Sequence, residues 1–216
     1  MRIGLLGGSF NPVHNAHLRI AGEAQSFCRL DRVIFIPAAD PPHKPVAGDV
    51  SFACRSVMVR MAIDGRAGFE MSTIEAERSG KSYSIDTIKI FREQFPDDEL
   101  FFIIGADSFL EIGTWHRCGE IFHSCNLIVV ERPGRPINNR IEALPKAVRT
   151  EFVSDRDNGP LSHDSGTTVS FITGAPLDIS STEIRRLSAA GADISTYVPP
   201  DVAAYISQQR IYSQCQ

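Results

Sequence analysis

The sequence lacks the cysteine pattern of a disulfide framework or of a zinc site. Its five cysteines are scattered and odd in number, and no two of them form a Cys-x-x-Cys pair. It also lacks an apolar run long enough to cross a membrane, and its N-terminus has no leader with a basic start and an apolar core. We therefore expect a cytoplasmic protein, and we do not expect a catalytic thiol.

An excess of positive charge is missing as well. The chain has 22 Lys and Arg against 26 Asp and Glu, a net charge of −4. This balance argues against broad binding to nucleic acid or to an anionic membrane, so any anionic ligand needs a local cluster of positive groups. The 216 residues, 43% hydrophobic and 22% charged, fit a globular chain. We expect a single domain over residues 1–216, with a C-terminal helical part from about residue 180.

The two best-known phosphate loops are absent from the opening segment, residues 2–18 (RIGLLGGSFNPVHNAHL). The segment has no Gly-Lys-[Ser/Thr] ending, so it is not a Walker loop, and its glycines lack the G-x-G-x-x-G spacing. It reads instead as a short strand, a break at Gly7-Gly8, an Asn-Pro turn and a helix that begins near Ala16. Such a turn directs backbone N–H groups at an anion, and the helix start adds partial positive charge.

Two histidines, His14 and His17, stand three residues apart at the start of this predicted helix. That spacing places them on one face of the first turn, an arrangement suited to a polyphosphate. The structural alternative is a core strand followed by a capped helix with two exposed histidines. The glycine pair, the proline and the preceding strand together favour the phosphate site.

Strands and helices alternate along the chain, which predicts an α/β fold. We expect a doubly wound parallel sheet, Rossmann-like, with helices on both faces. The expected later strands cover residues 33–37, 69–74, 100–104, 126–130 and 169–172, and the expected helices cover 16–28, 51–63, a segment from Ser84, a segment after Ser180 and a segment after Pro199. One helix is expected through Ile141, Leu144 and Val148, and LSHDSG is expected to be a loop.

The strand at residues 100–104 (LFFII) is the most apolar and should be central. We expect it to lie beside the first strand, at the point where the strand order reverses. Asp107 follows it, and this switch point would bring Asp107 against the Gly7-Gly8 turn. The structural alternative for Asp107 is a helix N-cap.

Several other segments carry residues suited to ligand binding. The Pro-rich loop AADPPHKP ends in His43 and Lys44, which favours a phosphate contact over solvated charge. Ser180, Ser181, Thr182 and Arg185 form a second anion site at a helix start, although Ser180 and Glu183 also fit a capping box.

The segments before and after the LFFII strand add further candidates. Thr87 could present a hydroxyl to a ligand at a helix mouth, beside Tyr83. Ser84 is the expected N-cap of this helix, and on the structural alternative Ser84 and Asp86 are only capping groups. Trp115 is either a core residue or a stacking platform for a flat ring, since its neighbours are polar. Arg132 follows the strand at residues 126–130.

Eight segments occur together in one known family. They are GGSFNPVHNAHL, PPHK, YSIDT, GADSF, WHR, RPG, ISSTEIRR and YVPPDVAAYI. Their order and spacing, from Arg2 to about Ile206, resemble the bacterial nicotinate-nucleotide adenylyltransferases of the nucleotidyltransferase superfamily. Asn11 and Ala16 stand where members often have Asp and Gly. The segment 155–166 is longer than the resemblance leads us to expect, and we assign it no role.

The resemblance implies transfer of AMP from ATP to nicotinate mononucleotide, which gives deamido-NAD and pyrophosphate in NAD biosynthesis. It implies catalytic roles for His14, His17 and Arg185. The implied ATP-binding residues are Gly7, Gly8, Ser9, Phe10, His14, His17, Ser180, Ser181, Thr182 and Arg185. The implied mononucleotide-binding residues are Lys44, Tyr83, Thr87, Asp107, Trp115 and Arg132. Mg²⁺ is expected to arrive with ATP, held by phosphate oxygens and water rather than by protein ligands.

Three alternatives stay open at this point. The same fold could act on nicotinamide mononucleotide, or on another acceptor such as phosphopantetheine or a phosphocholine-like head group with CTP. The chain could also be a non-catalytic module that binds adenine nucleotides. The expected partners are small molecules, not nucleic acid or membrane, and a homo-oligomer is an option that the sequence leaves open.

Overall fold

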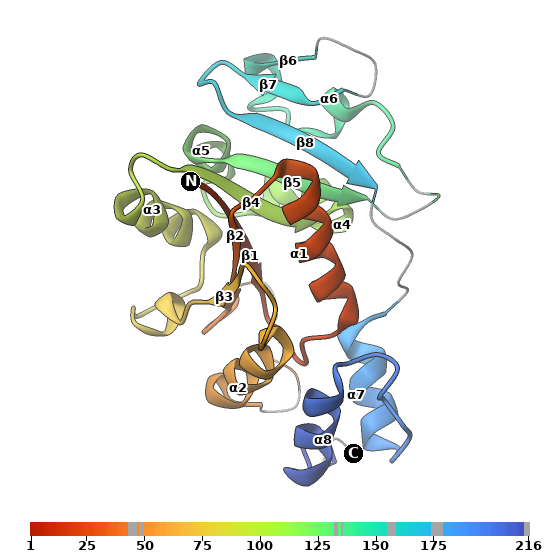
Figure 1. Cartoon of the computed structure of the whole chain (residues 1–216). Coiled ribbons are helices and arrows are strands. Elements are labelled where there is room, and N and C mark those ends of the chain that lie inside the picture. The colour runs from red at the N-terminus through yellow and green to blue at the C-terminus, as the bar shows by residue number, and fades with distance from the viewer. Residues whose placement is uncertain are drawn as a thin grey trace. The chain divides into compact units, whose positions relative to one another are not determined.

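The computed structural model describes residues 1–42, 47, 50–131, 134, 136–154, 159–173 and 179–213 (Figure 1). The strands are β1 (Arg2–Gly8), β2 (Arg32–Pro37), β3 (Phe69–Met71), β4 (Glu99–Gly105), β5 (Asn126–Glu131), β6 (Phe152–Ser154), β7 (Leu161–His163) and β8 (Thr168–Thr173). The α-helices are α1 (Asn15–Cys28), α2 (Phe52–Ile63), α3 (Ser84–Gln94), α4 (Ala106–Leu110), α5 (Cys118–Ser124), α6 (Arg140–Ala143), α7 (Ser181–Ala189) and α8 (Pro200–Gln208). Short 3₁₀ turns are η2 (Ile74–Ala76), η3 (Ile112–Thr114) and η4 (Arg149–Glu151).

The strands form one eight-stranded sheet in the order β3-β2-β1-β4-β5-β8-β7-β6. Strand β4 pairs in parallel with β1 and with β5, and β5 pairs in parallel with β8. Strands β6 and β7 extend the sheet with antiparallel pairing. The α/β fold is therefore confirmed, and the strand order reverses between β1 and β4, as the sequence predicts.

By its internal contacts the chain divides into two compact units, each built from three separate segments. Unit 1 comprises Met1–Leu6, Ala21–Val33 and Tyr83–Pro176, and unit 2 comprises Gly7–Ile20, Ile34–Ser82 and Leu177–Gln216. The single domain over residues 1–216 stays a prediction. No helix of the described residues is long and apolar enough to span a bilayer.

The core of unit 1 is built on β4 and β5. Residues 100–104 of β4 and 127–130 of β5 are buried, as expected for strands covered on both faces. Gly4 of β1 allows close packing, because a Cβ there would lie 2.8 Å from Leu30 Cδ1 and 3.0 Å from Ile103 Cδ1, and these side chains would have to shift. Helices α3 and α5 pack together, and the ion pair of Lys89 with Glu120 at 2.7 Å joins them.

In unit 2, α2 packs against α8. Helix α7 begins where the sequence predicts, because Ser180 is its N-cap and accepts a hydrogen bond from Glu183 N–H. Helix α8 begins at the expected proline pair. The part of this C-terminal segment that the structure describes is blue in Figure 1.

Three local predictions were wrong. The strand expected at residues 69–74 stops at Met71, since Ser72 Oγ accepts from Ile74 N–H and favours the turn η2. The helix expected through Val148 is only α6, because Leu144 precedes Pro145 and takes an extended conformation. Ser84 is the first residue of α3 rather than its N-cap, which is Tyr83.

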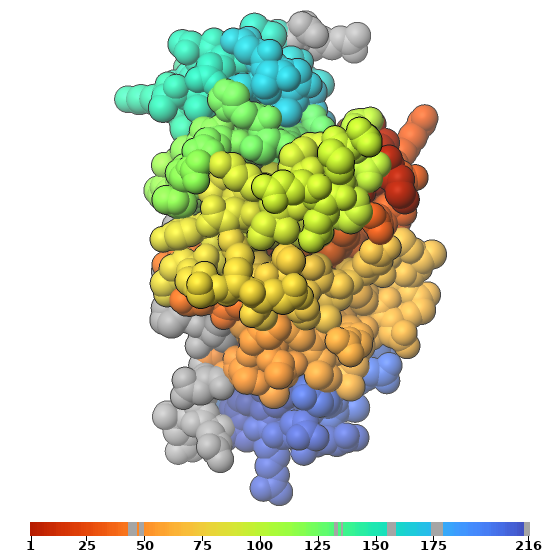
Figure 2. Space-filling view, turned by 90° about the vertical axis from the view of Figure 1, so that its left-hand side faces the viewer, coloured from red at the N-terminus to blue at the C-terminus, as the bar shows by residue number. Residues whose placement is uncertain are grey.

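The segment LSHDSG is a hairpin rather than a loop. Strand β7 pairs with β6 and β8, and the turn to β8 contains Gly166 at φ +89°. His163 closes the turn, because its N–H donates to Thr167 O and its carbonyl oxygen accepts from Gly166 N–H. The cyan surface in Figure 2 includes the residues of β6–β8 that the structure describes.

Candidate functional site

In unit 2 the chain leaves β1 through residues 7–13, here called the glycine turn, and leads to His14 and His17. Gly7 and Ser9 are exposed, whereas Phe10 is buried with a left-handed backbone, φ 45°. The Phe10 ring packs edge-on against His17, with ring centroids 5.0 Å apart, and lies 5.9 Å from the ring of Phe35. The buried Phe10 ring therefore anchors the turn, while the residues before it remain open to a ligand.

His14 and His17 stack on each other, with ring centroids 3.7 Å apart. His14 N–H donates to His17 Nδ1 at 3.2 Å, so the proton of a neutral His17 ring is on Nε2, where it can be donated. Burial lowers the pKa of His14 to about 4. Burial, and then the charge of His14, lower the pKa of His17 well below its usual value. Both rings are therefore neutral near pH 7.

His14 also carries an unsatisfied polar atom. Its Nδ1 is buried without a hydrogen-bond partner among the described residues. Such an atom costs free energy in the ligand-free protein and points to a missing partner. The pair thus offers ring nitrogens at the start of α1, where an anion is already favoured.

Helix α7 is tied directly to the glycine turn within unit 2. Arg185 Nη1 donates to Asn11 O at 2.8 Å, and Ser181 Oγ donates to Pro12 O at 3.1 Å. Arg185 Nη2 also donates to Thr182 Oγ1 at 3.1 Å, which fixes the guanidinium beside the helix start. The two anion sites predicted from separate parts of the sequence therefore belong to one hydrogen-bonded structure.

The start of α7 keeps groups available for an anion. Ser180 and Thr182 are exposed, and Arg185 is half-buried. By contrast, Arg186 is exposed and forms a 2.6 Å ion pair with Glu183 of its own helix. Arg185, not Arg186, is therefore the arginine directed at the glycine turn.

Unit 1 contains a second group of predicted site residues. Trp115 is half-buried and meets Phe102 edge-on, with ring centroids 6.3 Å apart, so it is not a fully buried core residue. The Tyr83 ring lies 4.3 Å from the ring of His116. Thr87 is 2% exposed and its hydroxyl donates to Tyr83 O at 3.4 Å, so this hydroxyl is already used inside α3.

Asp107 lies in the first turn of α4, and Gly105 is the N-cap of that helix. It is exposed and lines a pocket of about 510 Å³, whose other walls come from α6 and the segment before it. The closeness of Asp107 to the Gly7-Gly8 turn stays a prediction. Lys44 and Arg132 lie outside the described residues.

Comparison with known proteins identifies the family. The model of the cytidylyltransferase-like family matches residues 5–187. The chain is 60% identical to the probable nicotinate-nucleotide adenylyltransferase of Pelobacter propionicus over 100% of both chains. It is 52% identical to the protein of the same name from Geobacter metallireducens, over 99% of each chain.

The chain belongs to the nicotinate-nucleotide adenylyltransferase family. It is therefore a nucleotidyltransferase, and the family resemblance read from the sequence is confirmed.

The chain is similar in fold to a solved structure, the Plasmodium falciparum nicotinic acid mononucleotide adenylyltransferase complexed with NaAD. It matches with a TM-score of 0.76 at 20% identity and covers 98% of this chain and 97% of that chain. A putative nicotinate-nucleotide adenylyltransferase from Vibrio parahaemolyticus matches with a TM-score of 0.65 at 18% identity, over 99% and 96% of the two chains. Both confirm the fold.

Three residues that support the glycine turn of this adenylyltransferase were missed from the sequence. Arg55 of α2 is 1% exposed, and it donates to Ser9 O at 2.6 Å and to Ala38 O at 2.7 Å. Burial lowers the pKa of its guanidinium. An arginine within an apolar helical stretch was the only signal for it.

Asn11 and Tyr212 are the other two. Asn11 is 2% exposed, its Nδ2 donates to Ala47 O at 2.7 Å, and its Oδ1 accepts from the Tyr212 hydroxyl at 2.7 Å. Nothing in the sequence pairs these two residues. Arg55, Asn11 and Tyr212 are positioning residues, because each acts on the backbone or side chains of the turn.

Proposed function

We propose that the chain transfers AMP from ATP to nicotinate mononucleotide, giving deamido-NAD and pyrophosphate in NAD biosynthesis. The observation that carries this proposal is the hydrogen-bonded union of the Gly7–His17 segment with the start of α7, through Arg185 to Asn11 and Ser181 to Pro12. It gathers the groups that a polyphosphate needs. The names of the full-length relatives support the choice of substrates.

The chemistry requires no nucleophile from the protein. A phosphate oxygen of the mononucleotide attacks the α-phosphorus of ATP, a new P–O bond forms, and the bond to the bridging oxygen of pyrophosphate breaks. The attacking phosphate is already ionised near pH 7, so no general base is needed. The protein contributes positioning and stabilisation of the charge that moves to pyrophosphate.

We assign the ATP phosphates to unit 2. Gly7, Gly8, Ser9 and Phe10 approach ATP with backbone groups, and the two histidines bind its phosphates. His17 donates from Nε2 to the α-phosphate, since its Nδ1 already accepts from His14 N–H.

The start of α7 binds the leaving group. The exposed Ser180 and Thr182, together with Ser181, present hydroxyls and backbone N–H groups to the β- and γ-phosphates. Arg185 adds the positive charge that stabilises pyrophosphate as it leaves.

We assign the mononucleotide to residues of unit 1. Trp115, which is half-buried, stacks on the pyridine ring. Asp107 accepts a hydrogen bond from a ribose hydroxyl, and Tyr83 flanks the ring. Because the Thr87 hydroxyl already donates to Tyr83 O, its role at the pyridine carboxylate requires it to exchange that bond. Lys44 of unit 2 and Arg132 supply positive charge to the mononucleotide phosphate.

Mg²⁺ fits this proposal as a companion of ATP. In proteins Mg²⁺ is held mainly by carboxylates, substrate phosphates and water, and the groups assigned to the ATP phosphates here are imidazole, guanidinium and hydroxyl groups rather than carboxylates. The metal would be held by phosphate oxygens and water, and it supplies charge neutralisation at the phosphates. The substrates are small molecules, and neither nucleic acid nor a membrane takes part.

Release of pyrophosphate tests the proposal. The full chain is offered ATP and Mg²⁺ with nicotinate mononucleotide, and in parallel with nicotinamide mononucleotide. Turnover of the acid supports the proposal, and comparable turnover of both would make the pocket dual-specific. If no pyrophosphate were released from ATP with either mononucleotide, the proposal would be refuted.

Variants of two residues test the roles. His17→Ala and Arg185→Ala should lower kcat by about 10²–10³-fold with a smaller rise in the KM for ATP. Arg186→Ala is the matched control, because Arg186 is the next residue of the same helix and pairs with Glu183. A rise in KM at unchanged kcat would contradict the transition-state role.

A further inference from the structure

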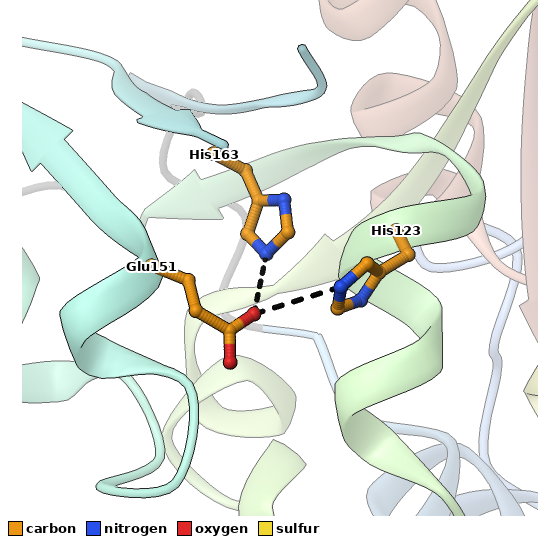
Figure 3. A group of neighbouring side chains, drawn as sticks. All are labelled: His123, Glu151 and His163. Carbon is orange, nitrogen blue, oxygen red and sulfur yellow. Dashed lines mark hydrogen bonds and ion pairs between the residues drawn. The ribbon is translucent and has the colours of Figure 1, made fainter. Parts of the chain in front are cut away.

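Three side chains outside the proposed site converge in unit 1. His123 lies on α5, Glu151 on η4 and His163 at the end of β7 (Figure 3). Glu151 Oε2 lies 2.9 Å from His163 Nε2 and 3.6 Å from His123 Nε2, and the three ligand atoms lie within 4.8 Å of one another. Two ring nitrogens therefore face one carboxylate oxygen.

The Nδ1 atoms of His123 and His163, which face away from Glu151, also make hydrogen bonds, and these orient both rings. His123 Nδ1 lies 3.0 Å from Gly119 O, and because a carbonyl oxygen only accepts, Nδ1 carries the proton and Nε2 offers a lone pair toward Glu151. A backbone carbonyl on the far nitrogen is the partner that metal-binding histidines commonly have.

The His163 side chain is 1% exposed, and its Nδ1 lies 2.8 Å from Ser165 Oγ. Ser165 Oγ in turn lies 3.1 Å from Thr167 Oγ1, which donates to Phe122 O. This chain of hydrogen bonds runs from the β7–β8 turn back to α5, which carries His123. The buried ring is thus held by the β7–β8 turn, which is itself hydrogen-bonded to α5.

The hydrogen bonds of His163 fix its tautomer. In the ligand-free tautomer, Ser165 N–H donates to His163 Nδ1 at 3.0 Å, so Nε2 of the neutral ring carries the proton and donates to Glu151. His123 Nε2 faces the same carboxylate oxygen at 3.6 Å. A cation bound to all three atoms would require the His163 proton to move to Nδ1, where Ser165 Oγ can accept it and Ser165 N–H must turn away.

We propose that His123 Nε2, Glu151 Oε2 and His163 Nε2 form a zinc site. Two imidazoles and a carboxylate are a ligand set that Zn²⁺ accepts, with water in the fourth position. Ligand atoms around tetrahedral Zn²⁺ lie about 3.3 Å apart, and the two carboxylate-to-imidazole distances of 2.9 and 3.6 Å already bracket that value. The His123 side chain is 55% exposed, so it has room to move and bring its Nε2 closer to the other two ligand atoms.

The bound ion would join the three elements that carry its ligands. Two of them are short, because β7 has three residues and η4 is a single turn. Zinc would tie them to α5 and stabilise this edge of unit 1. It also gives a role to part of the segment 155–166, for which the family resemblance supplies none.

Zinc titration of the full chain tests the site. The protein is stripped with a chelator, and Zn²⁺ is titrated in competition with a chromogenic chelator. We expect one Zn²⁺ per chain, and a loss of affinity of more than ~100-fold in His123→Ala and Glu151→Gln, because each removes one ligand. His116→Ala is the matched control: His116 is an exposed histidine outside the cluster, and its variant should bind as the wild type does.

Two further readouts separate the site from adventitious binding. Co²⁺ bound in place of Zn²⁺ should give the strong visible absorption of a tetrahedral site, and His123→Ala should abolish it. Zn²⁺ should raise the Tm of the wild type but not that of His123→Ala. The proposal is overturned if Zn²⁺ binds more weakly than millimolar, if the variants bind as tightly as wild type, or if the Co²⁺ spectrum is octahedral.

Discussion

Acid should destabilise the protein through the buried histidines of the glycine turn. His14 is 6% exposed, and burial lowers its pKa from 6.5 to about 4. The unfolded chain therefore takes up a proton at His14 near pH 6.5, whereas the folded protein does so only near pH 4. Between these values the unfolded state binds more protons, so the free energy of unfolding falls as the pH falls.

The size of this effect follows from the difference between the two pKa values. The two pKa values, 6.5 and about 4, differ by about 2.5, and a difference of one corresponds to about 1.4 kcal/mol. His14 therefore accounts for a loss of about 3 kcal/mol in the free energy of unfolding from pH 7 to pH 4. The contribution is fully present above pH 6.5 and is gone below pH 4. His17 acts in the same direction, because its pKa is lowered as well.

Urea unfolding from pH 7 to pH 4, followed by far-UV circular dichroism, measures this loss. His14→Asn should flatten the dependence of the unfolding free energy on pH by about 3 kcal/mol over that range. His116→Asn is the control, since it removes an exposed histidine, and its curve should run parallel to that of the wild type. If the His14→Asn curve also ran parallel to the wild-type curve, burial would not lower the pKa of His14 and the reasoning would fail.

Three further predictions concern the turn and the tryptophan. Arg55→Met should lower the free energy of unfolding by about 1–3 kcal/mol and raise the KM for ATP, because the carbonyl oxygens of Ser9 and Ala38 lose their charged donor; Arg60→Met, at an exposed position of the same helix, should do neither. Tyr212→Phe should remove the hydrogen bond to Asn11, which costs about 1 kcal/mol, and so lower Tm by roughly 2–4 °C in a thermal melt. Trp115→Ala should raise the KM for nicotinate mononucleotide about 10-fold or more while leaving the KM for ATP unchanged in steady-state kinetics, and equal rises would contradict stacking.

The parts of the fold that depend on local pattern were predictable. Residues 100–104 are a continuous apolar run, and such a run is what a strand buried on both faces requires. The N-cap Ser180 and the proline pair before α8 were readable for the same reason, because capping acts within one turn of the chain.

The short edge strands were not predictable from pattern. Strands β6 and β7 have three residues each, too few for an alternation to stand out, and their pairing with β8 depends on a turn at Gly166. The helix expected through Val148 failed for a local reason that was visible, since Pro145 forbids helical backbone at Leu144.

The types of the candidate site residues were predictable, but their connections were not. Histidines, hydroxyls and an arginine next to helix starts indicate phosphate binding. Arg185 and Ser181 donate to the carbonyl oxygens of Asn11 and Pro12, and a backbone acceptor has no signal in the sequence. Arg55 was missed for the same reason, because both of its partners are carbonyl oxygens.

Two partners of the glycine turn are synthesised long after the turn itself. Asn11 forms hydrogen bonds with Arg185 and Tyr212, which follow it by 174 and 201 residues. At about 5–20 residues per second, the ribosome needs roughly 10–40 s to make the intervening chain. A chain that ends before Tyr212 therefore keeps the hydrogen bond of Arg55 to Ser9 O but lacks that of Tyr212 to Asn11, so only a chain translated to Tyr212 makes all of these contacts.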